Sequence, residues 1–102
     1  MLYFLVPESH LEVVKEAIFA VGAGSIGNYC KCAWQTVGQG QFMPLTGSQA
    51  FIGEIGKLET VAEYKVEIMC TDEQIKLAVS ALKQAHPYEE PAYQVVQLVN
   101  ID

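Results

Sequence analysis

Residues that could bind a ligand occur together in the string His86-Pro87-Tyr88-Glu89-Glu90-Pro91. An imidazole and two carboxylates on a proline-stiffened segment can bind a metal ion or a cationic group. Two prolines and a tyrosine can also serve as a rigid connection between a helix and a strand. We therefore take His86, Tyr88 and Glu89 as candidate ligand-binding residues, with the structural role as the alternative.

A further candidate, His10, lies in the sequence Ser9-His10-Leu11-Glu12. A serine followed three residues later by a glutamate predicts a capping box at the start of a helix. Because free amides at a helix N-terminus attract anions, His10 could face a ligand there. The alternative is a surface histidine without a ligand.

Cys30 and Cys32 are two of three cysteines in the chain, and this odd number favours reduced thiols. If both lie on one extended strand, their side chains share a face and could bind one soft ion, such as Cu(I) or Zn(II). His10, His86 or a neighbouring subunit would have to complete the site. A divalent or soft metal ion is thus the cofactor that the sequence suggests, and two buried, unreactive thiols are the alternative.

The sequence assigns no catalytic residue. None of its serines lies in a nucleophile elbow. A G-x-G-x-x-G string spans residues 22–27. It follows a predicted helix instead of a strand, so it is not expected to cradle a phosphate. An enzyme would therefore need a site made between subunits.

Composition excludes other classes. The 102 residues carry a net charge of −6, and all six basic residues are lysine, which argues against nucleic acid binding. No apolar run approaches the roughly 18 residues of a membrane span. The N-terminus has no basic region and reaches Pro7 too early for a signal peptide, so we expect a cytoplasmic protein.

The hydrophobic pattern predicts alternating strands and helices. Strands are expected at 2–6, 27–37, from 41, at 62–70 and at 92–99; helices at 9–22 and 71–85; a turn at 38–40; and an irregular excursion at 44–56. This order predicts one α+β domain over residues 1–102, a ferredoxin-like βαββαβ sandwich. It has two helices on one face of an antiparallel sheet and an elaborated central hairpin. The expected core comprises Leu11, Val14, Ile18, Val66, Ile68, Val79 and Leu82.

Four stretches carry a resemblance to a known family. They are Val6-Pro7-Glu8-Ser9-His10-Leu11, Gly22-Ala23-Gly24-Ser25-Ile26-Gly27-Asn28-Tyr29, Gly40-Gln41-Phe42 through Phe51-Ile52-Gly53, and His86-Pro87-Tyr88-Glu89-Glu90-Pro91-Ala92-Tyr93. In this order they resemble the domain inserted into bacterial YqfO proteins of the Nif-three-like family. That insert is similar in fold to the CutA and PII proteins, whose subunits typically form trimers. Where this chain has Cys30 and Met43, stand-alone relatives often have Asp and a basic residue, which weakens a polar or anion site at those positions.

The resemblance implies a small regulatory or ligand-sensing module. The alternatives are a CutA-like divalent-metal-binding protein and an enzyme with a site between subunits. The dinuclear metal site of the larger Nif-three-like proteins lies in another domain and is not implied. We expect a homo-oligomer, with a trimer favoured over a dimer; a protein partner is the further candidate for an interaction. Its interface would cover the apolar residues of the excursion, unless these fold back over their own sheet: Phe42, Phe51, Ile52 and Ile55.

Overall fold

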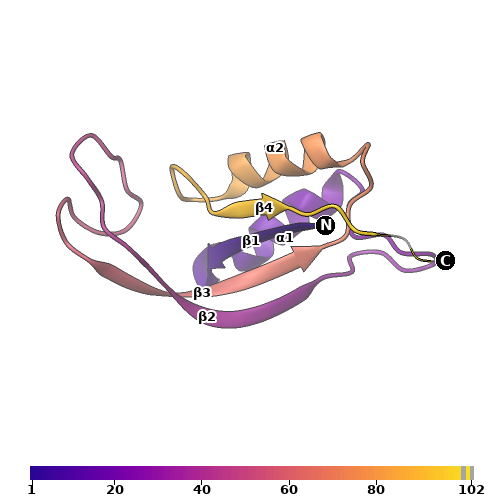
Figure 1. Ribbon diagram of the computed structural model, residues 1–102, viewed down its shortest axis with the longest axis horizontal. Helices are drawn as coiled ribbons and strands as arrows, with labels where there is room; N and C mark the ends of the chain where they lie inside the picture. The colour runs from indigo at the N-terminus through magenta and orange to yellow at the C-terminus, as the bar shows by residue number, and fades with distance from the viewer. Residues whose placement is uncertain (100, 102) are drawn as a thin grey trace.

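Four antiparallel strands form one sheet in the order β2-β3-β1-β4, and both helices cover the same face of it (Figure 1). The computed structural model describes residues 1–99 and 101. Its elements are β1 (Leu2–Pro7), the 3₁₀ turn η1 (Glu8–His10), α1 (Leu11–Ala20), β2 (Trp34–Phe42), β3 (Glu59–Ile68), α2 (Ile75–Ala85) and β4 (Tyr93–Val95). The predicted ferredoxin-like α+β fold is therefore confirmed, with β1 inside the sheet between β3 and β4.

The core lies between the sheet and the helices. Leu2, Phe4 and Val6 alternate along β1 and are fully buried beneath the helices, because successive strand residues point to opposite faces. Six of the seven predicted core residues are buried: Leu11, Val14, Ile18, Val66, Ile68 and Leu82. The seventh, Val79, packs against the core but is only partly buried, and its neighbour Ala78 takes the fully buried position on α2.

The strand predicted at 27–37 is confirmed only from Trp34 onwards, and the turn predicted at 38–40 is wrong. The preceding segment is irregular because Lys31 has a φ of 55° and the Cys32 amide donates to the Gly24 carbonyl. The strand β2 then begins at Trp34 and runs straight through Gly38 and Gly40 to Phe42, paired throughout with β3. The hairpin turns later, in the long connection 43–58.

Both helices begin later than predicted. At α1 the Ser9 hydroxyl pairs with His10 Nδ1 at 2.9 Å instead of capping the helix, so the predicted capping box is absent. Ahead of α2, the Thr71 amide donates to Gln74 Oε1 at 3.1 Å. The other end of α2 is as predicted: Pro87 follows, and His86 leaves the helix with an extended backbone (ψ 137°).

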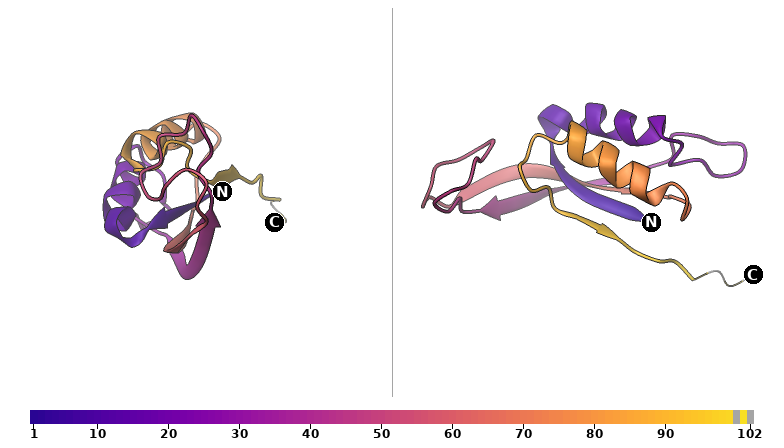
Figure 2. Two further views of the ribbon diagram at one scale, coloured as in Figure 1. Left: turned by 90° about the vertical axis from the view of Figure 1, so that its left-hand side faces the viewer. Right: turned by 90° about the horizontal axis from the view of Figure 1, so that it is seen from above.

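The last strand is shorter than the predicted 92–99. It spans Tyr93–Val95, and beyond it Met1 and Val96 exchange hydrogen bonds between their backbone groups. The molecule is elongated, 49 × 24 × 22 Å, and the β2–β3 hairpin reaches away from the helices at one end (Figure 2). No helix in the described part of the chain is long and apolar enough to cross a membrane.

Candidate functional site

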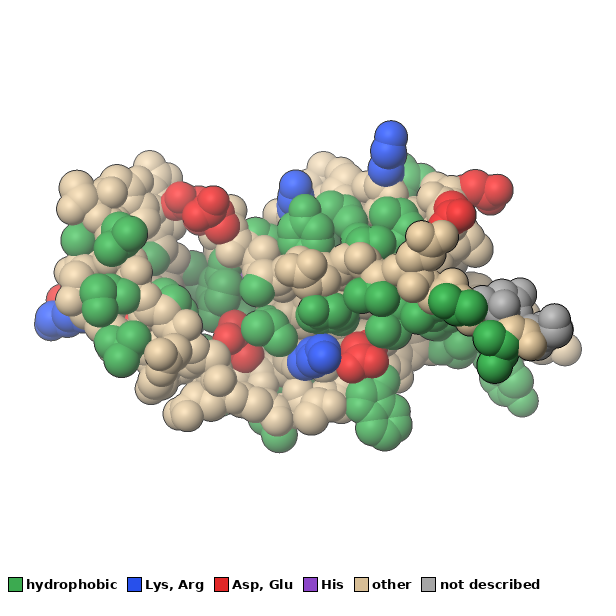
Figure 3. Space-filling view, viewed as in Figure 1, with side chains coloured by type: hydrophobic (Ala, Val, Ile, Leu, Met, Phe, Trp, Pro, Cys, Tyr) green, Lys and Arg blue, Asp and Glu red, His purple; other side chains and the backbone are tan. Residues whose placement is uncertain are grey.

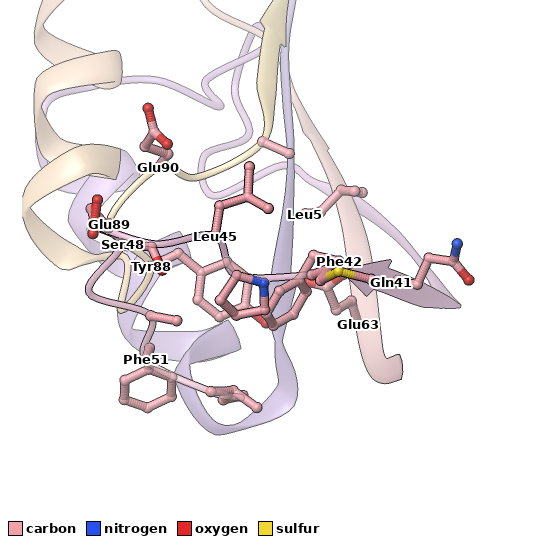
Figure 4. A pocket seen from close by; sticks show the side chains of 16 residues that line it. Leu5, Gln41, Phe42, Leu45, Ser48, Phe51, Glu63, Tyr88, Glu89 and Glu90 are labelled. Atoms are coloured by element: carbon pink, nitrogen blue, oxygen red, sulfur yellow. The ribbon is translucent and has the colours of Figure 1, made fainter. Parts of the chain in front are cut away.

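A cavity of about 450 Å³ opens where the hairpin connection faces the segment between α2 and β4. Figure 3 shows the hollow between the protruding hairpin and the body of the domain. Its walls are mostly apolar and come from β1, the end of β2, the connection, β3 and the 86–92 segment (Figure 4). The aromatic, hydroxyl and carboxylate side chains in its lining include Phe42, Ser48, Phe51, Glu63, Tyr88, Glu89 and Glu90.

His86 anchors the 86–92 segment to the sheet. Its Nε2 lies 2.7 Å from the Leu5 carbonyl oxygen, and the Tyr88 amide donates to its Nδ1 at 3.1 Å. A carbonyl can only accept and an amide can only donate, so this histidine is the neutral tautomer with its proton on Nε2. Burial lowers the pKa of His86, outweighing the opposite effect of the Leu5 hydrogen bond. Both ring nitrogens thus have partners within the domain, and a ligand-binding role for His86 stays a prediction.

Tyr88 is the centre of an aromatic cluster. Its ring lies 4.9 Å from the His86 ring, 6.0 Å from Phe42 and 6.3 Å from Phe51, measured between centroids. His10 packs edge-on against the other side of Phe51 at 5.5 Å. The structure thus brings His10, His86 and Tyr88 together at one end of the molecule, although neither histidine lines the cavity.

Glu89 holds the hairpin connection in place. Its carboxylate accepts a hydrogen bond from the Gln49 amide at 2.6 Å, which joins residues 40 positions apart. Hydrogen bonds to an ionised carboxylate are stronger than neutral ones. Glu89 therefore closes one side of the cavity, and its neighbour Glu90 also lines it.

Two hydroxyl groups in the cavity wall lack hydrogen-bond partners. Of the buried side-chain polar atoms in the described residues, only Ser48 Oγ and the Tyr88 hydroxyl oxygen have none, and both residues line the cavity. Burial, followed by the nearby Glu63 carboxylate, raises the pKa of Tyr88 to about 12. The Glu63 carboxylate lies near this hydroxyl, and hydrogen bonding between the two groups adds to the rise in the pKa of Tyr88. Buried polar groups are nearly always paired, so two orphans in one cavity point to a missing partner.

Glu63 and Ser48 were not predicted as site residues. Glu63 lies on the sheet face opposite the helices and is only 7% exposed, with Gly40 of β2 and Tyr88 beside it. The alternation of β3 predicts a solvent-facing glutamate at this position. No neighbouring residue in the sequence indicates that Glu63 is buried. Ser48 lies in the irregular connection, where the sequence gives no periodic signal.

Cys30 and Cys32 do not lie on a common strand, so the geometric reason for expecting a shared metal ion is wrong. They flank Lys31, which has a left-handed backbone, and the Cys32 thiol points to the Cys30 carbonyl oxygen at 3.8 Å. Among the described residues, no group of three or more His, Cys, Asp or Glu side chains is placed to hold a metal ion. A soft-metal site at these cysteines stays a prediction.

Comparison with known proteins gives relatives that include several GTP cyclohydrolase 1 type 2 homologs. The chain is 45% identical over 94 residues to a GTP cyclohydrolase 1 type 2 homolog from Mycobacterium leprae, a match that covers 92% of this chain and 24% of that protein. It is 44% identical over 99 residues to the protein of the same name from Halalkalibacterium halodurans, covering 97% of this chain and 27% of the relative. The chain thus spans about a quarter of the length of the curated relatives it matches. No protein-family model matches it.

Two solved structures are similar. A Bacillus cereus protein related to NIF3 superposes with a TM-score of 0.83 and 37% identity, over 97% of this chain and 25% of that one. The periplasmic divalent cation tolerance protein CutA from Archaeoglobus fulgidus superposes with a TM-score of 0.69 over 97% of this chain and 82% of its own. Its identity is 15%, so this likeness concerns the fold alone. The chain is therefore a homologue of one quarter-length segment of the NIF3-related proteins, and it has the CutA-like fold.

Proposed function

We propose that this domain is a regulatory module that binds a small molecule in the cavity at its hairpin end. The observation that carries the proposal is the pair of unpartnered hydroxyls, Ser48 Oγ and the Tyr88 hydroxyl, in the wall of one cavity. The volume of about 450 Å³ falls within the roughly 300–1,000 Å³ of small-molecule sites, which are mostly apolar with a few polar groups. A ligand that satisfied both hydroxyls would remove a desolvation penalty that the free protein bears.

The regulatory part of the proposal rests on how the two sides of the cavity are held. The 86–92 segment is fixed to β1 through His86, whereas the hairpin connection is tied to it through Glu89 and Gln49. A ligand between them contacts both sides and favours the closed arrangement of the connection. A change in the position of the hairpin could then be sensed by another domain or another subunit, and the relatives are proteins about four times as long as this chain.

The experiment is an NMR titration of the ¹⁵N-labelled protein with tryptophol, a neutral indole alcohol. We expect saturable shifts of the amide signals of Ser48, Tyr88 and Glu89 at millimolar concentrations. An Ala50→Trp variant, which fills the cavity from its wall, should lose these shifts. Thr46→Trp is the matched control, since this exposed residue lies in the same connection but does not line the cavity. Equal binding by both variants, or shifts elsewhere in the molecule, would contradict the proposal.

A further inference from the structure

We infer that the ligand of this cavity is a flat aromatic compound that carries a positively charged amine or amidine. This inference rests on the proposed function and names the chemical class of the ligand. The charged group would meet the Glu63 carboxylate, the ring would lie among Phe42, Phe51 and Tyr88, and the two orphan hydroxyls would fix its orientation.

Glu63 is an acidic group without a cation. The residue is only 7% exposed and lines the cavity, and within the described residues no lysine or histidine forms an ion pair with it. The Tyr88 hydroxyl lies near its carboxylate, but this group is neutral and leaves the negative charge uncompensated. The lysine two residues along β3 is engaged elsewhere: Lys65 Nζ lies 3.7 Å from Glu67 and 4.6 Å above the centre of the Tyr3 ring. A buried carboxylate is unfavourable unless a donor or a cation reaches it. A cation from solution can reach the Glu63 carboxylate through the cavity.

Gly40 makes room for this carboxylate. Gly40 lies on β2 diagonally across from Glu63, whose register partner is Gly38, and a Cβ atom built on Gly40 would collide with Glu63 Oε1. The Gly40 backbone is not in the left-handed region. Glycine is therefore needed here because a side chain would not fit, and not because of the backbone conformation. The absent side chain lets Glu63 lie across β2 at the floor of the cavity, instead of extending into solvent.

The charge of the lining selects against anions. Three carboxylates line the cavity, those of Glu63, Glu89 and Glu90, and no lysine or histidine does so. Glu89 has the Gln49 amide as a partner, and Glu90 is exposed, which leaves Glu63 as the group that can take up a positive charge inside. A phosphate or carboxylate would be repelled from such a site. The cavity is thus unsuited to a nucleoside triphosphate.

The aromatic walls suit a flat cation. Phe42, Phe51 and Tyr88 contribute aromatic rings from three segments of the chain: the end of β2, the connection and the 86–92 segment. A cation near an aromatic face is stabilised by the negative charge density of the ring, most strongly where water is excluded. A planar ring that bears an amine would combine stacking, this attraction and the ion pair with Glu63.

The test uses three indole compounds of similar shape and different charge: tryptamine (cationic), tryptophol (neutral) and indole-3-acetate (anionic). We expect the parent protein to bind tryptamine at least tenfold more tightly than tryptophol, and indole-3-acetate more weakly than both. In Glu63→Gln, which keeps the shape and removes the charge, the preference for tryptamine should disappear. Glu73→Gln, an exposed residue that does not line the cavity, makes the same change in net charge and should keep the preference.

The outcomes separate the two proposals. If all three compounds bind the cavity equally, or if Glu63→Gln keeps the preference, the ligand class is wrong while the binding site stands. If none of them shifts the signals of the cavity residues, the proposed function is wrong as well. Circular dichroism and the amide spectrum of each variant establish that it is folded before binding is compared.

Discussion

The backbone of Leu5 holds both ends of the 86–92 segment. Its carbonyl accepts the hydrogen bond from His86 Nε2 at 2.7 Å, and its amide donates to the Ala92 carbonyl at 3.0 Å. One residue of the central strand therefore closes the loop that carries Tyr88 and Glu89. These two side chains owe their position to a strand residue more than eighty positions earlier in the chain.

Acidic pH should destabilise the protein through His86. The pKa of His86 is lowered in the folded state, so between that value and the unfolded value of 6.5 the unfolded chain binds more protons. The neutral histidine thus contributes stability above pH 6.5, and this contribution is lost as the pH falls through the folded pKa. Urea denaturation at a series of pH values should show the decline. His86→Gln should flatten it, whereas an unchanged slope in this variant would assign the decline to other groups.

Gly40→Ala should destabilise the protein by about 1–3 kcal/mol, because the added methyl group meets the Glu63 carboxylate. Gly38→Ala is the matched control on the same strand, since a Cβ there has nothing within 4 Å. Chemical denaturation measures both variants. Glu63→Ala in the Gly40→Ala background should restore most of the loss. Equal effects of the two glycine substitutions would show that strand geometry, and not the carboxylate, requires Gly40.

Tyr88→Phe should raise the free energy of unfolding of the free protein by about 1 kcal/mol, because it removes a buried hydroxyl without a partner. The ring stays and keeps its contacts with Phe42 and Phe51. The same variant should bind tryptamine more weakly than the parent. Thermal and urea denaturation give the stability, and a decrease in stability would mean that the hydroxyl has a partner in solution.

Self-association is expected from the edge of the sheet. The outer strand β2 is nine residues long and exposes Trp34 (68%) and Val37 (63%). Long, apolar edge strands are usually covered, and a second copy is the nearest cover. Light scattering should give a multiple of the chain mass of 11.2 kDa, with a trimer expected. Val37→Lys should lower that mass, and a monomeric parent protein at tens of micromolar would refute the prediction.

The parts of the fold that repeat with a regular period could be predicted from the sequence. The spacing of Leu11, Val14 and Ile18 predicts the buried face of α1, and Pro87 predicts the end of α2. The turn predicted at 38–40 is wrong because glycine is typical of turns. Here Gly40 lies within a strand and lets the Glu63 side chain pack closely against the backbone. Such contacts depend on residues distant in the chain.

The candidate site was predicted only in part, for the same reason. The string around Tyr88 and Glu89 indicates a ligand-binding segment, and both residues line the cavity. Glu63 carries no such signal, because a glutamate between two core-facing strand residues looks like an ordinary surface group. Its burial depends on residues distant in the chain, Gly40 on β2 and Tyr88 in the 86–92 segment, which lie beside it only in the folded domain.

The unequal attachment of the two cavity walls has a consequence for exchange rates. The Leu5 amide belongs to the centre of the sheet, so its hydrogen should exchange with solvent only when the whole domain unfolds. The Gln49 amide is held by the Glu89 carboxylate at the surface and can be released when the connection alone swings away. A ligand can then enter and leave through a local opening, many times during the life of one folded molecule. Its residence time would be set by that opening and not by the stability of the fold.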